Sequence, residues 1–310
     1  MAPALHALSH ELAFTPPLFP DNLFGHLVAT AVPGVEEWRG GAYRRTVRFA
    51  GGRYGILALL PPQSAAASTV EARLLLTDPA DAPAALGVAR RLLDLDADPA
   101  AIDAVLGADP ALAPLVRAAP GRRVPGVADG AEMAVRAVLG QQVSTAAART
   151  HAGRLVAAAG VSVDDPEGGL THLFPEPAAV AAEAERGDRA VLAFPATRLR
   201  TLRSLAQALA AGAVPALQPG ADAECVRAAL GELPGFGPWT IETILMRALA
   251  DGDAFIPTDL GIRQTAQALG LPHTPAALTA RSQAWRPWRA YAVQHLWATG
   301  AHAVNVMPGS

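Results

Sequence analysis

The feature that most constrains this chain is a glycine-containing turn between two amphipathic segments. Residues 233–240 read LPGFGPWT. Apolar residues recur at helical spacing over 223–230 before the turn and over 240–249 after it. The pattern predicts two helices joined by a hairpin, because glycines permit a tight turn and proline suits the first position of a helix.

The backbone of this hairpin is a candidate anion site. Pro238 at the first position of the second helix leaves that helix's unpaired N–H groups pointing out of the turn formed by Gly235, Phe236 and Gly237. Such a cluster of backbone donors can hold a phosphate without a charged side chain. An ordinary helix hairpin stays open as the alternative, since two glycines at this spacing are common.

Four blocks of sequence carry a family resemblance. They are AVLGQQVS at 137–144, LPGFGPWT at 233–240, IPTDLGIR at 256–263 and WRPWRAYAVQHLW at 285–297. They resemble the AlkA-type DNA-3-methyladenine glycosylase II family of the helix-hairpin-helix glycosylase superfamily, in the family's order. The resemblance implies a mostly α protein, with a helix-hairpin-helix glycosylase core of two helical subdomains and an N-terminal α+β domain.

The character of the sequence changes near residue 90. Residues 1–90 are predicted to form the N-terminal α+β domain, with strands at 43–49, 54–60 and 70–76 and helices at 23–32 and about 80–93. Residues 91–310 read as helical, and helices are expected at 99–106, 110–118, 130–139, 144–159, 177–185, 190–192 and 197–211. Within this core the resemblance implies one helical subdomain over about 124–251, which contains the hairpin, and a second over about 91–123 plus 252–310.

Composition excludes several classes of protein. Cys225 is the single cysteine, which excludes an intramolecular disulfide and a four-cysteine iron–sulfur cluster. No apolar run approaches the roughly 18 residues of a membrane span, so we expect a soluble, cytoplasmic protein. A net charge of −3 argues against holding nucleic acid by bulk electrostatics. Arg122–Arg123 and Arg198–Arg203 are candidates either for local phosphate-binding patches or for solvated faces.

Asp259 is the candidate catalytic residue. Alone it would be interpreted as the N-cap of a helix that begins at Leu260. Its place in the IPTD block implies instead the carboxylate that stabilises an oxocarbenium-like sugar and orients or deprotonates the attacking water. Glu242 is a competing carboxylate, which we expect at the surface.

The chain has no lysine, and all 25 of its basic residues are arginine. In bifunctional relatives a lysine just after the hairpin forms a Schiff base with the sugar, and Trp239 occupies that position here. The resemblance therefore implies a monofunctional enzyme that leaves an abasic site.

Tryptophans are the candidate walls of a base pocket. The resemblance implies that Trp239 and Trp297 line it, and each indole face would attract a cationic alkylpurine by about 0.5–2 kcal/mol. Trp285 and Trp288 are expected in the core. In the turn at 140–142 the resemblance implies that Gln142 is a polar wedge filling the gap left by a flipped nucleotide, and an exposed loop amide is the alternative.

Other polar side chains have weaker assignments. We expect His26 to be buried by packing in the N-terminal domain rather than to reach the base pocket. Arg263 and Arg289 are candidates to support Asp259, to contact phosphate or to pair at the surface. No side chains have metal-ligand spacing, so no cofactor is expected. The resemblance leaves room for a monovalent cation at the hairpin carbonyls.

The residues and the resemblance together predict a monofunctional glycosylase of base-excision repair. It would act on double-stranded DNA with alkylated purines of the 3-methyladenine and 7-methylguanine type. Two alternatives stay open: a glycosylase for a neutral damaged base such as hypoxanthine or uracil, and a non-catalytic helix-hairpin-helix DNA-binding protein. We expect a monomer with no obligate protein partner and no membrane association.

Overall fold

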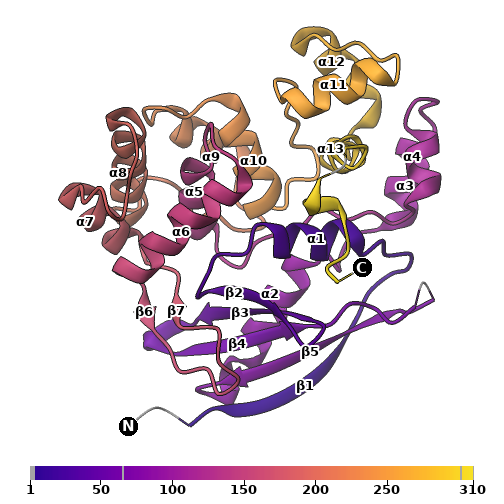
Figure 1. Cartoon of the computed structure of the whole chain (residues 1–310). Coiled ribbons are helices and arrows are strands. Elements are labelled where there is room, and N and C mark those ends of the chain that lie inside the picture. The colour runs from indigo at the N-terminus through magenta and orange to yellow at the C-terminus, as the bar shows by residue number, and fades with distance from the viewer. Residues whose placement is uncertain (1–3, 65, 301, 310) are drawn as a thin grey trace.

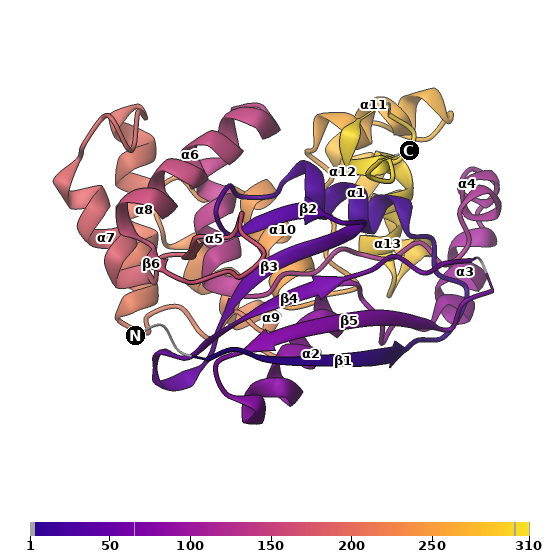
Figure 2. The same cartoon turned by 60° about the horizontal axis from the view of Figure 1, so that its bottom comes forward.

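The computed structural model describes all residues except 1–3, 65, 301 and 310, and it places helices over a five-stranded antiparallel sheet (Figure 1). The strands run in the order β1-β5-β4-β3-β2, as Figure 2 shows. Their bounds are β1 His6–Ala13, β2 Glu36–Arg39, β3 Ala42–Arg48, β4 Tyr54–Leu59 and β5 Thr69–Leu76. The predicted α+β character of the N-terminal region is therefore confirmed.

One face of the sheet carries an apolar core. In β5 the alternate residues from Val70 to Leu76 are buried, because successive side chains of a strand point to opposite faces. Helices α1 (Asp21–Ala29) and α2 (Ala82–Leu92) contribute to the same apolar cluster. This packing fixes α1 between the sheet and the other helices (Figure 1).

The opposite face of β3 is covered by a later part of the chain. Two short strands, β6 (Val161–Ser162) and β7 (His172–Leu173), form a ribbon whose connecting loop lies against the sheet. The Arg44 guanidinium is 2.8 Å from the Asp165 carboxylate, and the Thr46 hydroxyl donates to the His172 carbonyl at 2.8 Å. Arg44 can be almost fully buried in a strand because this ribbon supplies its partner.

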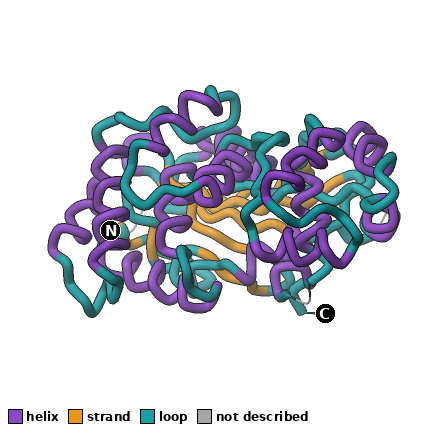
Figure 3. Tube along the Cα trace, turned by 90° about the horizontal axis from the view of Figure 1, so that it is seen from above, coloured by secondary structure: helices purple, strands orange, loops and turns teal. Residues whose placement is uncertain are grey.

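The remaining helices form two groups above the sheet (Figure 3). One group holds α5 Gly130–Leu139, α6 Thr145–Ala159, α7 Pro177–Arg186, α8 Ala196–Ala210, α9 Ala223–Gly231 and α10 Pro238–Ala248. The other holds α3 Pro99–Gly107, α4 Ala113–Ala118, α11 Leu260–Ala268, α12 Pro275–Arg281 and α13 Arg289–Trp297. Among the described residues no helix is both long and apolar enough to cross a membrane.

A buried ion network joins the sheet to α5. Arg45 of β3 lies 2.8 Å from Glu132 of α5, and Arg136 bridges Glu132 at 2.8 Å and Glu36 of β2 at 2.9 Å. The Tyr43 hydroxyl donates to Glu36 as well. Burial opposes ionisation of Glu36, but the nearby arginines and the hydrogen bonds it accepts hold the pKa of this carboxyl below its usual value. The network therefore fixes the orientation of α5 relative to the sheet.

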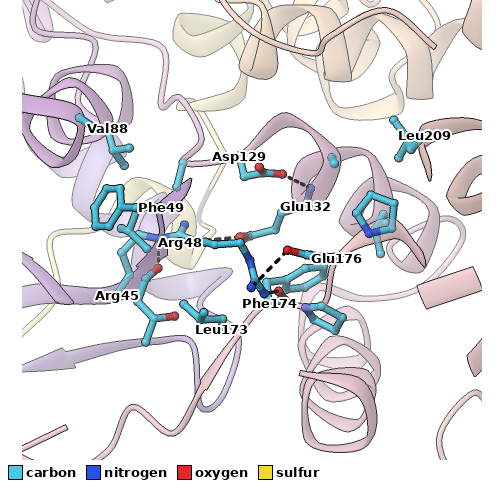
Figure 4. A pocket seen from close by; sticks show the side chains of 18 of the residues that line it. Arg45, Arg48, Phe49, Val88, Asp129, Glu132, Leu173, Phe174, Glu176 and Leu209 are labelled. Atoms are coloured by element: carbon cyan, nitrogen blue, oxygen red, sulfur yellow. Dashed lines mark hydrogen bonds and ion pairs between the residues drawn. The ribbon is translucent and has the colours of Figure 1, made fainter. Parts of the chain in front are cut away.

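A cavity of about 880 Å³ lies beside this network, between β3, α2, α5 and the segment after β7 (Figure 4). Arg48 reaches across it to Glu176 at 3.3 Å, and Asp129 caps α5 by accepting from the Glu132 amide at 2.7 Å. Its carboxylates already have partners within the protein, so the cavity offers no obvious site for chemistry.

Some expectations from the sequence were wrong. The segment 190–192 is a turn rather than a helix, because it lies between the left-handed Gly187 and Pro195 and the Asp188 carboxylate binds the Ala190 amide at 2.8 Å. The region after residue 91 also contains the β6–β7 ribbon. Strands β1 and β2 were missed because most of their side chains are not buried. The predicted domain limits stay predictions.

Candidate active site

A pocket of about 1220 Å³ opens where the two helical groups meet α1. It is lined by the α5–α6 turn at 140–144, by one face of α10, by residues 259–261 at the start of α11, by Trp297 and by His26. Three of the sequence-predicted residues, Asp259, Trp239 and Trp297, therefore lie in one pocket. Gln142 and Gly235, which belong to the two turns, also line it.

Asp259 receives three N–H hydrogen bonds. Its Oδ1 accepts from the Ile262 amide at 2.9 Å and from the Trp297 indole at 3.0 Å, and its Oδ2 accepts from the Trp239 indole at 2.8 Å. Asp259 is thus the N-cap of α11 and also the carboxylate of the pocket, so the two interpretations of this residue are compatible. No arginine or histidine among the described residues forms an ion pair with Asp259.

Three side chains of α10 follow one another into the pocket. Trp239, Thr243 and Arg247 are spaced by four residues and therefore share a helix face. Trp239 is 37% exposed, whereas Thr243 and Arg247 are 6% and 7% exposed, so the face runs from the rim to the floor. The Thr243 hydroxyl donates to the Trp239 carbonyl at 2.7 Å.

The hairpin between α9 and α10 has one glycine that its geometry requires. Gly235 has φ +81°, and a β-carbon there would lie 2.2 Å from the Thr201 hydroxyl oxygen. Gly237 has φ −97° and open space around its missing β-carbon, so the turn does not depend on glycine at this position. No described residue accepts a hydrogen bond from the backbone N–H of Gly235 or Gly237.

The α5–α6 turn is fastened to this hairpin. Gln141 donates its side-chain amide to the Gly235 carbonyl at 3.1 Å and to the Thr240 hydroxyl at 3.2 Å. Its neighbour Gln142 has φ +56° and is exposed, so it projects from the turn while Gln141 holds it. The sequence singled out Gln142 and missed the tethering role of Gln141, although both lie in the same block.

Burial and contacts within the protein decide between several alternatives for the arginines. Arg122 and Arg123 are 7% and 0% exposed, so they form neither a phosphate patch nor a solvated face. Arg289 pairs with Asp253 at 2.7 Å, and Arg263 donates to the His273 carbonyl at 2.9 Å, so neither supports Asp259. These arginines were ambiguous in sequence because their partners are distant or come from the backbone.

His26 lines the pocket, contrary to the expectation that it would only pack in the N-terminal domain. Burial, together with the nearby Arg247 and Arg136, lowers the pKa of His26 well below its ordinary value. The imidazole is therefore neutral near pH 7 and adds no positive charge to the pocket.

The competing carboxylate has a structural partner. Glu242 lies 2.8 Å from the Arg227 guanidinium. The pair joins α10 to α9, so Glu242 contributes to the hairpin rather than to the pocket. Among the described residues, no group of three histidine, cysteine, aspartate or glutamate side chains is placed to hold a metal ion. The monovalent cation at the hairpin carbonyls stays a prediction.

Two family models match this chain. The AlkA N-terminal domain matches residues 9–129, and the HhH-GPD superfamily base excision DNA repair protein matches residues 135–290. The matched ranges contain all of the sheet except the first residues of β1, and they contain the hairpin and Asp259. The chain belongs to the HhH-GPD superfamily of base excision DNA repair proteins and, within it, to the AlkA family.

Individual relatives agree with this assignment. DNA-3-methyladenine glycosylase 2 of Escherichia coli is 34% identical over 292 residues, which cover 94% of this chain and 97% of the relative. A probable bifunctional transcriptional activator/DNA repair enzyme AlkA of Mycobacterium tuberculosis is 52% identical over 301 residues. The match covers 97% of this chain but only 59% of the length of that relative. A solved 3-methyladenine DNA glycosylase from Archaeoglobus fulgidus shares the fold, with a TM-score of 0.77, 19% identity and coverage of 93% of this chain and 97% of the other.

Proposed function

We propose that this chain is a monofunctional DNA glycosylase that hydrolyses the N-glycosidic bond of alkylated purines in duplex DNA. The observation that carries the proposal is Asp259, a carboxylate oriented by three N–H donors that lies in the pocket without a cation partner. Its negative charge is available to a positively charged group that enters the pocket.

The chemistry follows from that charge. When the C1′–N9 bond of the nucleotide breaks, its electron pair leaves with the base and positive charge develops on the sugar. A carboxylate beside C1′ stabilises this charge, and water then adds at C1′ and gives up a proton. The indole N–H groups of Trp239 and Trp297 fix the carboxylate in place before the reaction, so little reorganisation is needed.

The surrounding loops suit a duplex with one nucleotide rotated out. The N–H groups of Gly235 and Gly237, from which no described residue accepts a hydrogen bond, would donate to a phosphate, and the exposed Gln142 would enter the gap. Both loops lie at the edge of the pocket that holds Asp259. The proposed partner is therefore double-stranded DNA with an alkylated base.

The absence of lysine supports a single activity. No residue of this sequence can form the Schiff base that lyase chemistry needs from a lysine amine. The product we propose is an intact strand with an abasic site. The cytoplasmic location and the monomeric state stay predictions.

The deciding experiment measures release of methylated bases from alkylated duplex DNA by the wild type, by Asp259→Asn and by Asp253→Asn. The wild type should release 3-methyladenine, and Asp259→Asn should bind the DNA but release at least about 100-fold less. Asp253→Asn is the matched control because it removes a carboxylate that lies outside both the pocket and the hairpin. Wild-type protein that binds alkylated DNA but releases no base would contradict the proposal and favour a non-catalytic DNA-binding protein.

A further inference from the structure

The three arginines at the start of α8 divide between two faces of the helix. Arg198 is half-buried, whereas Arg200 and Arg203 are exposed. Residues spaced by three or four share a helix face, so Arg198 lies on the side of the buried Thr201 and Leu202. Arg203 follows Arg198 by five residues, which turns its side chain by roughly 140° around the helix. Arg198 is therefore the member of this run that faces the other helices.

Arg198 belongs to a cluster with two side chains of α6 and one aromatic ring. Its guanidinium carbon lies 5.2 Å from the ring centroid of Phe194, and the ring of His151 on α6 is 4.4 Å from the same phenyl group. Arg154 follows His151 by three residues on one face of α6. Burial lowers the pKa of His151, and the nearby Arg154 and Arg198 lower it further. These four residues form what we call the α6–α8 cluster.

No carboxylate neutralises the α6–α8 cluster. Among the residues that the structure describes, none forms an ion pair with Arg154 or Arg198, and none accepts a hydrogen bond from them. By contrast, Arg186 on the neighbouring α7 pairs with Glu183 at 2.5 Å. The buried Nδ1 atom of His151 also has no hydrogen-bond partner in the described part of the chain. The guanidinium groups are therefore available to an acceptor from outside the protein.

The α6–α8 cluster lies beside the hairpin that is proposed to hold a phosphate. A β-carbon at Gly235 would lie 2.2 Å from the Thr201 hydroxyl oxygen, so the first turns of α8 contact the hairpin. Arg198 precedes Thr201 by three residues and lies about one helical turn from this contact. Both α6 and α8 belong to the helical group that contains the hairpin (Figure 1). A DNA strand bound at the hairpin continues with a phosphate at every nucleotide, so the next acceptors would lie near the start of α8.

The charge balance of the chain favours a DNA backbone as the partner of this cluster. The net charge is −3, so the protein as a whole repels DNA, and attraction must come from local cations. Guanidinium groups only donate hydrogen bonds, and their geometry matches the oxygens of a phosphate. Two such groups without a carboxylate nearby would attract successive phosphates of one strand.

We propose that Arg154 and Arg198 bind the phosphates that follow the one held by the hairpin, and that the DNA-binding surface therefore extends from the α9–α10 hairpin across α8 to α6. The inference rests on the proposed function, which supplies DNA as the ligand. Phosphates carry no base identity, so the cluster adds affinity for duplex DNA in general rather than for a damaged base. The contact with Phe194 holds the Arg198 side chain in place before DNA binds, which lowers the entropy lost on binding.

The test measures the binding constant for duplex DNA at several salt concentrations by fluorescence anisotropy. Each phosphate contact contributes about 0.9 to the slope of the logarithm of the binding constant against the logarithm of the salt concentration. Arg154→Gln and Arg198→Gln should each lower the slope by about this amount. Between 50 and 200 mM salt, the wild type should therefore lose about 3- to 4-fold more affinity than either variant. The change in slope should be equal for undamaged and alkylated duplexes.

Arg203→Gln is the matched control. It removes the same charge from the same helix, but on an exposed face turned away from the cluster. This variant should keep the wild-type slope. Arg154 is exposed, so Arg154→Gln tests the proposal even if Arg198→Gln does not fold without the contact to Phe194. An unchanged slope in a folded Arg154→Gln or Arg198→Gln, or an equal fall in Arg203→Gln, would overturn the proposal.

Base release measured in parallel separates this proposal from the proposed function. If the two variants lower the slope but the wild type releases no alkylated base, the glycosylase assignment fails and the phosphate contacts stand. If the wild type releases alkylated bases and the slope does not depend on Arg154 and Arg198, only the phosphate contacts fail. Wild-type protein that does not bind duplex DNA would contradict both.

Discussion

Two aspartates of this protein bind tryptophan indoles, and they differ in what else they contact. Asp109 accepts from Trp285 and is paired with Arg281, and it is 6% exposed. Asp259 accepts from Trp239 and Trp297 and has no cation partner. Both also accept from a backbone amide, that of Ala111 in the turn before α4 and that of Ile262 in the first turn of α11. An indole N–H group therefore donates both to an aspartate that an arginine neutralises and to an aspartate without a cation partner.

Under the proposed function, this difference separates the structural role of Asp109 from the chemical role of Asp259. At Asp109 the guanidinium cancels the charge, so the contact joins the segment before α4 to α12 and the turn that follows it. At Asp259 the indoles orient the carboxylate but leave its charge for an incoming cation. Under the proposed function, an indole–aspartate contact alone is therefore not diagnostic of a catalytic site, and the paired arginine is what distinguishes Asp109 from Asp259.

We expect the largest effect on base release when the charge of Asp259, which no cation neutralises, is removed. Asp259→Asn should lower base release by about 10²–10³-fold or more, because an amide cannot stabilise the positive sugar. The amide oxygen can still accept from the Ile262 amide, so the midpoint of thermal unfolding should change little. Single-turnover release and a thermal melt on one preparation test this, and a large loss of stability would make the site structural.

The opposite pattern is expected at the neutralised site. Asp109→Asn should destabilise the fold by about 3 kcal/mol, the lower end of the range for a broken buried pair, because Arg281 is 30% exposed. Denaturant unfolding measures this change. Base release per folded molecule should stay near the wild-type value. A loss as large as that of Asp259→Asn would show that the two aspartates do not differ in role.

A third carboxylate shows what burial does without a contacting cation. Asp94 accepts from the Tyr291 hydroxyl and the Val124 amide, and burial raises its pKa from 3.8 to about 6. The folded state then binds this proton more tightly than the unfolded state, so the contribution of Asp94 to stability should fall as pH rises from about 4 to about 6.

The raised pKa of Asp94 corresponds to a pH-dependent change of about 3 kcal/mol at most in the free energy of unfolding. Asp94→Asn cannot ionise, and asparagine tolerates the φ of +50° at this position. The variant should lose this part of the pH dependence of the unfolding free energy. Equal slopes for the two proteins between pH 4 and 6 would show that Asp94 is not the titrating group.

The smallest effect is expected from removing one orienting donor. Trp239→Phe keeps an aromatic face but loses the N–H that binds Asp259 Oδ2, and it should lower the rate of base release about tenfold. Trp285→Phe is the control, since it removes an indole N–H from Asp109 and should affect stability rather than rate. Equal rates for Trp239→Phe and the wild type would mean that the Ile262 amide and Trp297 suffice to hold the carboxylate.

Much of this organisation could be predicted from the sequence. The hairpin, the helix that begins at Leu260 and the two pocket tryptophans lie in contiguous blocks whose residue types are restricted by turn geometry and capping. The structure brings Asp259, Trp239 and Trp297 into contact, while their chemical roles stay predictions.

What the sequence could not supply depends on contacts between distant segments. Arg122 and Arg123 look like surface residues in sequence, and only the packing of the N-terminal region buries them. Arg247 was missed because it is one of many arginines, although its spacing of eight from Trp239 on one helix would have suggested a pocket position. The pairing or isolation of an arginine is a tertiary property, so composition alone does not reveal it.

The hydrogen bonds of Gln141 have a consequence for how this protein would search DNA. They fix the separation between the loop proposed to enter the duplex and the hairpin proposed to hold its backbone. Because this spacing is constant, DNA must bend to make both contacts. The free-energy cost of that bending depends on the stiffness of the DNA sequence. DNA sites with weak base stacking would bend at a smaller free-energy cost. The protein would therefore recognise damage first by how easily the DNA bends and only afterwards by the chemistry of the base.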